Sequence, residues 1–147
     1  MDVLLKWLVV ALLATRPPQQ PPPLAEGQSL RFMATSAALT HHLPPSLVHR
    51  VVEIESAWNP RAIKYEPKVR AATIGLMQIF PSTAGLSAAQ LFKPEANLTA
   101  GCRYLAACIR AAGGSIRRGL ICYNGGAGCL KKRCPSAENY AQLFNIK

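Results

Sequence analysis

Residues 45 to 60 read PSLVHRVVEIESAWNP, and this stretch decides the fold class. Apolar side chains recur in it every three to four residues, at Leu47, Val51, Ile54 and Trp58. That spacing is typical of one face of an α-helix. Proline suits the first turn of a helix, and an Asn-Pro pair ends one. The pattern therefore predicts a helix that ends at Asn59-Pro60.

The same periodicity predicts helices elsewhere in the chain. They are expected over residues 29–40, 81–84, 94–112, 116–123 and 137–144, with Tyr140, Leu143 and Phe144 as core contacts of the last. Residues 61–71 are polar and contain Pro67, so we expect a loop there. No alternating run with an Asn-Gly or Asp-Gly turn is found. We predict a mainly α fold with one domain.

The beginning of the chain differs from the rest. Residues 3–14 are apolar except for Lys6, and a proline-rich stretch follows over residues 17–23. The apolar run is short for a membrane span of about 20 residues but suits an export signal. We expect residues 1–28 to be a leader and linker and residues 29–147 to be the folded domain. An uncleaved membrane anchor and a true start at Met33 are the alternatives.

The net charge of +10 would attract nucleic acid, anionic lipid or an acidic polymer. Basic residues cluster at Arg117-Arg118 and at residues 131–133, yet little aromatic interleaving accompanies them. No basic recognition helix or paired-cysteine finger is found. We therefore expect no nucleic-acid partner, and either an acidic polymer or a solvated basic face.

The five cysteines lie in the last third of the chain, and their odd number leaves at least one thiol unpaired in a monomer. Cys102 and Cys108 are about 9 Å apart along one predicted helix, which is beyond the reach of a disulfide. A disulfide involving Cys129 or Cys134 is the better candidate. There is no C-x-x-C pair and the histidines are remote, so we expect neither a metal site nor a cofactor.

Glu55 is the carboxylate of interest. Val48, Val52 and Glu55 are spaced i, i+4 and i+7, which places Glu55 at the edge of the apolar face, whereas Glu53 points away. An apolar margin raises the pKa of a carboxyl group and lets it donate a proton near neutral pH. A partly exposed glutamate without a role is the alternative, and periodicity alone favours it.

Three short motifs occur in order around this residue. They are ESAWNP at 55–60, GLMQI at 75–79 with PSTA at 81–84, and YNGG at 123–126. Together they resemble the soluble lytic transglycosylase family over about residues 38–140. The resemblance implies a lysozyme-like α-helical fold in a catalytic domain that acts on peptidoglycan. The bond cleaved in that family joins N-acetylmuramic acid to N-acetylglucosamine.

The resemblance also implies roles for individual residues. Glu55 would be the catalytic residue, and Ser56 would support the structure around it. Met77 and Gln78 would line the glycan groove, although core packing is the alternative for Met77. Tyr123 and Asn124 would face the carboxyl group, with the Tyr123 hydroxyl holding it in place.

Some positions depart from the commonest form of the family. Residues 72–74 read Ala-Thr-Ile where Gly-Ala is usual, and Asn124-Gly125-Gly126 replaces Asn-Ala-Gly. These positions, and Tyr65-Glu66-Pro67, resemble the subgroup found in phages and specialised secretion systems. The resemblance thus implies a periplasmic or exported protein that serves a secretion, conjugation or phage assembly.

The reaction follows from the scarcity of acidic residues. The only aspartate is Asp2, so the domain has none to act as a second carboxylate. In the family the glutamate acts as acid and then as base, and the sugar's own 6-hydroxyl forms a 1,6-anhydro end. Two alternatives remain: a hydrolytic muramidase that uses Glu66 as a second carboxylate, and an inactive wall-binding scaffold.

Overall fold

The computed structural model describes residues 26–146. Of the expected leader and linker, residues 1–25 lie outside the described residues, whereas residues 26–28 belong to the first turn of α2. The helices are α2 (Glu26–Thr40), α3 (Pro45–Ser56), α4 (Pro81–Ala84), α5 (Ala88–Leu91), α6 (Pro94–Ala111), α7 (Ile116–Gly125) and α8 (Pro135–Gln142), with a 3-10 helix η1 (Ala127–Leu130). The strands are β1 (Ile63–Glu66) and β2 (Ala71–Ile74). The predicted mainly α fold is confirmed, and α5 is an addition to it.

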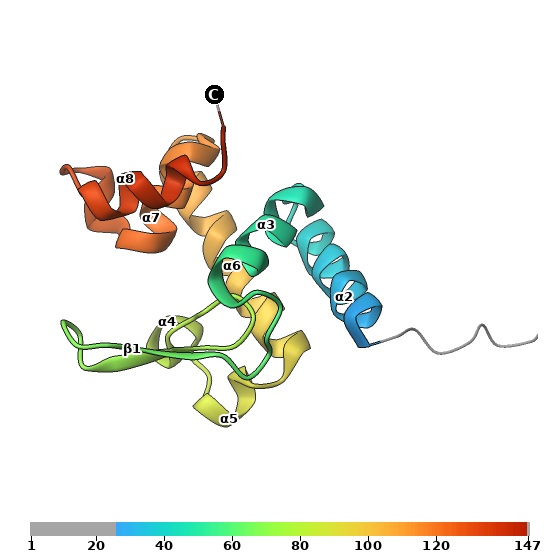
Figure 1. The fold of residues 1–147 in the computed structure, drawn as a ribbon. Coiled ribbons are helices and arrows are strands. Elements are labelled where there is room, and N and C mark those ends of the chain that lie inside the picture. Colours follow the sequence, from blue (N-terminus) through green and yellow to red (C-terminus); the bar gives the residue numbers. More distant parts are fainter. Residues whose placement is uncertain (1–25, 147) are drawn as a thin grey trace, which may run out of the picture.

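Helix α6 is the centre of the domain (Figure 1). It packs against α2, α7, α5 and α4. Leu98, Cys102 and Leu105 are completely buried on it, as the helical spacing predicts. Gly101 lies against the side chain of Met77, where a Cβ atom would collide. Helix α6 therefore connects α2, the first described helix, to α7, and it also supports the 75–79 segment. Within residues 26–146, no helix has both the length and the apolar character needed to span a bilayer.

Helix α3 ends earlier than the sequence predicts. It stops at Ser56, because Ala57 adopts a left-handed conformation (φ 48°) and its N–H bonds to the Glu53 carbonyl. Trp58 also has a positive φ of 64° and lies outside the helix. The Trp58 ring nevertheless packs edge-on to His49 at 5.4 Å and below the Arg31 guanidinium at 4.4 Å. The tryptophan thus ties the end of α3 to α2.

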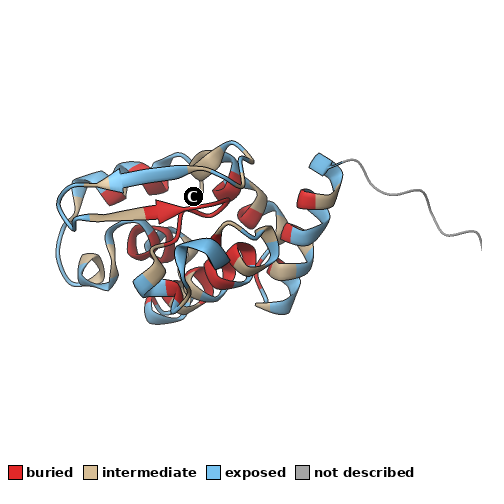
Figure 2. Cartoon of the chain, turned by 90° about the horizontal axis from the view of Figure 1, so that it is seen from below, coloured by how far each residue is buried: buried red, intermediate tan, exposed pale blue. Residues whose placement is uncertain are grey.

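The loop expected over residues 61–71 is wrong, because these residues belong mostly to a β-hairpin. Strands β1 and β2 pair in antiparallel register from Ile63↔Ile74 to Glu66↔Ala71. The strands have four residues each, and β1 has no buried position, so the alternating pattern that reveals longer strands is missing. Arg70 takes the positive φ (50°) that glycine supplies in commoner turns. Figure 2 shows the exposed first strand beside the more buried second strand.

Helix α8 closes the domain. Tyr140 is buried and Phe144 is half-buried against the core, as predicted. Leu143 is 49% exposed, so its predicted core contact is wrong. The helix ends at Gln142, one residue before it, and the helical spacing no longer applies there.

Two disulfides organise the last third of the chain. Cys108–Cys122 joins α6 to α7, and Cys129–Cys134 closes the segment between α7 and α8. Cys102 is an unpaired, buried thiol. The predictions that Cys102 does not pair with Cys108 and that Cys129 or Cys134 is bridged are confirmed.

Candidate active site

An open cleft of about 650 Å³ lies between the β-hairpin and the α7–α8 region. One wall comes from the hairpin, the 78–80 segment and α4, and the other from the end of α7, the following segment and the start of α8. Among its lining residues are Glu55, Glu66, Gln78, Tyr104, Tyr123 and Asn124. Motifs that are far apart in the sequence therefore meet at one cleft.

Glu55 lies in the last turn of α3 and faces this cleft. Its side chain is half-buried, and Oε1 accepts a 2.6 Å hydrogen bond from the Tyr140 hydroxyl. Burial raises the pKa of Glu55, while the Tyr140 bond and the charge of Lys64 act in the opposite direction. The direction is the one predicted from its place at the edge of the apolar face. Glu55 is thus suited to hold a proton at a higher pH than an exposed glutamate does.

The tyrosine that holds the carboxyl group is Tyr140, not Tyr123 as expected. The Tyr123 hydroxyl donates a 2.6 Å hydrogen bond to the Met77 carbonyl oxygen. A buried hydroxyl needs a partner, and this backbone oxygen satisfies it. The sequence predicts Tyr140 only as a core residue. Helical spacing indicates that a side chain is buried, but it does not show that the hydroxyl bonds to a carboxyl group 85 residues earlier in the chain.

Ser56 supports the site from behind, as the resemblance implies. Its Oγ lies 2.8 Å from the Leu76 carbonyl oxygen and 3.1 Å from that of Val52. The bond to Leu76 joins the end of α3 to the 75–79 segment. Ser56 is therefore placed to act through the structure around Glu55, and it does not line the cleft.

Gln78 and Met77 differ in a way that the sequence does not show. Gln78 lines the cleft, but its amide nitrogen donates to Gly75 O (2.9 Å) and Ala62 O (3.1 Å), and its oxygen accepts from Thr73 (2.8 Å). Met77 is fully buried against α6, so the expectation that its side chain borders the groove is wrong. Core packing, the alternative, is what the structure shows.

Asn97 is a residue that the sequence analysis missed. It is completely buried on α6 and makes three short bonds to backbone. Its amide donates to Ile74 O (2.7 Å) and Leu91 O (2.9 Å), and its oxygen accepts from the Met77 N–H (2.8 Å). Asn97 thus fixes the backbone on both sides of Gly75. An asparagine in the middle of an apolar helical stripe was the available signal.

Glu66 brings a second carboxylate to the cleft. It lies at the end of β1 rather than in a loop, and its Oε1 pairs with Lys64 Nζ at 2.8 Å. Its negative charge contributes to the raised pKa of Glu55. The side chains of Lys64 and Glu66 therefore put one positive and one negative charge opposite the buried carboxyl group. Asn124 lies exposed at the end of α7, on the other wall.

Comparison with known proteins gives one family. The model described as "Transglycosylase SLT domain" matches residues 32–143. Membrane-bound lytic murein transglycosylase C of Photorhabdus laumondii is 30% identical over 129 residues, covering 74% of this chain and 35% of that protein. The protein of that name from Actinobacillus pleuropneumoniae is 37% identical over 81 residues, 47% of this chain and 21% of that protein. The chain therefore spans about a fifth to a third of these relatives.

Solved structures show the same fold. The 70 kDa soluble lytic transglycosylase of Escherichia coli superposes with a TM-score of 0.67 at 23% identity, covering 82% of this chain and 23% of that one. An inactive mutant of the lytic transglycosylase Slt from Pseudomonas aeruginosa gives 0.66 at 24% identity, with 77% and 22% covered. The predicted lysozyme-like fold is confirmed.

Proposed function

The chain belongs to the transglycosylase SLT domain family, and we propose that it is a peptidoglycan lytic transglycosylase. The bond cleaved is the β-1,4 bond between N-acetylmuramic acid and N-acetylglucosamine, and the product carries a 1,6-anhydromuramic end. One observation carries the proposal: a half-buried carboxyl group, Glu55, with a raised pKa, lines an open cleft of about 650 Å³ and is held by Tyr140.

The reaction needs one carboxyl group that works twice. Protonated Glu55 gives its proton to the glycosidic oxygen, which leaves with N-acetylglucosamine as the C1–O bond breaks. The resulting carboxylate then takes the proton of the muramic acid 6-hydroxyl, whose oxygen forms the new bond to C1. No water is consumed. An internal nucleophile has a large entropic advantage over one from solution.

The other proposed site residues divide into two groups. Asn124 and the ring of Tyr123 lie at the cleft surface, where they can contact the glycan. Ser56 and Gln78 act by holding the 75–79 segment, since their polar groups bond to backbone. Met77 contributes the carbonyl oxygen that orients Tyr123.

Hydrolysis is the second candidate, and the place of Glu66 favours it. A hydrolytic glycosidase uses two carboxyl groups on either side of the bond, and Glu66 lines the same cleft as Glu55. One of its carboxylate oxygens is already engaged by Lys64 Nζ at 2.8 Å, so that contact must open before this oxygen can bind a water molecule. For this reason we place the muramidase second.

Mass spectrometry of the muropeptides released by the purified protein separates the candidates. Anhydro ends indicate the transglycosylase, and reducing ends indicate the muramidase. Glu55→Gln should lower release by at least about a thousandfold, while the matched control Glu53→Gln, on the exposed side of α3, keeps it. Glu66→Gln should leave anhydro release within a few fold. Release by the Glu55 variant would refute both enzymes, and an inactive native protein would support the scaffold.

The cellular setting is a further part of the proposal. The relatives above are named membrane-bound, and the apolar run over residues 3–14 suits export. We therefore place the domain in the periplasm or outside the cell, where it would open the wall for a secretion, conjugation or phage assembly. Fusion of residues 1–28 to a reporter active only after export tests the location.

A further inference from the structure

The cleft wall between α7 and α8 has only a weak hydrophobic anchor. No residue from Asn124 to Ser136 is fully buried, and the apolar side chains that pack against the core there, Cys129, Leu130 and Cys134, are partly buried. Several of the residues in this segment line the cleft. Ordering such a segment costs conformational entropy, and three partly buried side chains offset little of it. Another constraint must hold this wall in shape.

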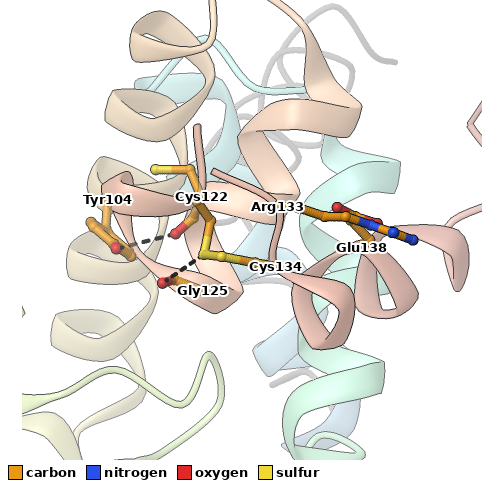
Figure 3. Close-up of a disulfide and its surroundings, with 7 residues drawn as sticks. Tyr104, Cys122, Gly125, Arg133, Cys134 and Glu138 are labelled. Carbon is orange, nitrogen blue, oxygen red and sulfur yellow. Dashed lines mark hydrogen bonds and ion pairs between the residues drawn. A yellow bond between two sulfur atoms is a disulfide. The ribbon is translucent and has the colours of Figure 1, made fainter. Parts of the chain in front are cut away.

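The Cys129–Cys134 disulfide is placed to supply that constraint (Figure 3). Cys129 Sγ lies 3.2 Å from the Gly125 carbonyl oxygen, at the end of α7. A Cβ atom on Gly125 would be only 2.6 Å from that sulfur. Cys134 is the N-cap residue of α8. The disulfide therefore rests on the end of one helix and is bonded to the start of the next.

The other contacts of this wall are weak. The Arg118 guanidinium donates to the Leu130 carbonyl at 3.1 Å in an exposed bond. Arg133 and Glu138 are 3.5 Å apart with side chains 82% and 30% exposed, and an ion pair of this kind contributes little. The covalent bond is thus the main restraint on residues 126–134.

The remaining cysteines are protected from exchange. Cys108 and Cys122 are each 2% exposed, so a thiol in solution cannot readily reach their disulfide. Burial raises the pKa of the Cys102 thiol to about 12, and a protonated thiol does not attack disulfides. Cys129 and Cys134 are both partly exposed. A small thiol therefore meets this bond first.

We infer that Cys129 and Cys134 form a positioning pair: their disulfide shapes the substrate-binding wall, and the enzyme binds glycan well only after the pair is oxidised. This rests on the proposed function. Opening consumes two reagent thiols. One attacks a cystine sulfur and frees the other cysteine; the second attacks the reagent sulfur of the resulting mixed disulfide and releases the protein cysteine bound to it. Two electrons pass to the protein, which gains two thiols, and the reagent becomes a disulfide.

Steady-state kinetics on soluble, uncrosslinked glycan strands test the inference, with and without dithiothreitol. Mass spectrometry after alkylation identifies the form in which Cys129–Cys134 is reduced while Cys108–Cys122 stays intact. In that form KM should rise about tenfold, since misplaced substrate contacts weaken binding, while kcat stays within about twofold because the buried residues of α8 keep Tyr140 in place. Far-ultraviolet circular dichroism should not change.

Two variants serve as controls. Cys129→Ser/Cys134→Ser should have the raised KM from the start and no response to the thiol. Cys102→Ala should respond as the native protein does. Two results would overturn the inference. One is an unchanged KM in the reduced form, and the other is a KM that rises only when the circular dichroism signal of the folded domain is lost. Absence of any muropeptide release by the oxidised protein would instead refute the proposed function. The dissociation constant for glycan strands, oxidised against reduced, then decides the inference.

Discussion

The two walls of the cleft are held by different physical means. On the hairpin side, backbone turns are fixed by polar side chains inside the core: Thr73, Gln78 and Asn97, the buried polar residues of the described chain, all lie there. On the α7–α8 side, residues 124–136 have no fully buried side chain, and a disulfide restrains them. The first wall depends on the folding of the whole domain. The second can change while the domain stays folded.

The largest effect that tests this comparison is on the hairpin side. Asn97→Ala leaves the Met77 N–H and the Leu91 carbonyl without partners, while the Ile74 carbonyl keeps its bond from the Ile79 N–H, and each buried unsatisfied group costs about 1–3 kcal/mol. We expect the free energy of unfolding to fall by about 3–5 kcal/mol in urea denaturation. Asn139→Ala, an exposed position of α8 on the other side, is the matched control and should stay within about 0.5 kcal/mol. Equal losses in the two variants would remove the distinction between the walls.

A smaller effect is expected at the contact between α8 and α3. Tyr140→Phe removes the hydrogen bond that lowers the pKa of Glu55, so that pKa should rise further. Because protonated Glu55 is the acid, activity is lost as pH rises through its pKa, and the alkaline limb of the pH–rate profile should move to higher pH. Stability should fall by about 1.5–3 kcal/mol.

The direction in which the alkaline limb of the Tyr140→Phe profile moves decides that experiment. A limb that moves to lower pH would mean that Tyr140 does not stabilise the carboxylate. Tyr104→Phe, on the same cleft but without a short bond to a carboxyl group, is the control and should leave the limb in place.

The smallest effect on stability is expected for a substitution on the surface of the α7–α8 wall. Arg133→Ala removes an ion pair whose arginine side chain is 82% exposed. Such pairs contribute less than about 1 kcal/mol, so the thermal midpoint should hardly move. A double-mutant cycle with Glu138→Ala measures the coupling directly. Coupling well above that size would show that charge, and not only the disulfide, holds this wall.

The sequence predicts the helices well because their apolar spacing is regular, as in α6 with Leu98, Cys102 and Leu105. It misses the hairpin because strands of four residues carry too little pattern and Arg70 stands where a glycine would signal the turn. It misplaces the end of α3 because Ala57, in a left-handed conformation, ends the helix before the chain reaches Asn59-Pro60.

The same limit applies within the site. The place of Glu55 at the edge of the apolar face follows from its spacing, while the motif alone selects it as the candidate acid. The roles of Tyr123 and Tyr140 are not predictable, since both spacings indicate buried rings and only the three-dimensional arrangement decides which hydroxyl reaches Met77 and which reaches Glu55. Residue spacing reports which face a side chain lies on, whereas a hydrogen bond depends on ångström distances between helices.

The start of α2 lies at the opposite end of the domain from the β-hairpin in both views of the fold (Figures 1 and 2). A surface or a fused partner attached at Glu26 would therefore leave the mouth of the cleft pointing outward. The last helix, by contrast, begins at the rim of that mouth. For immobilised assays or chimeras, the start of α2 is therefore the attachment point that keeps the cleft accessible, and insertions at the start of α8 are to be avoided.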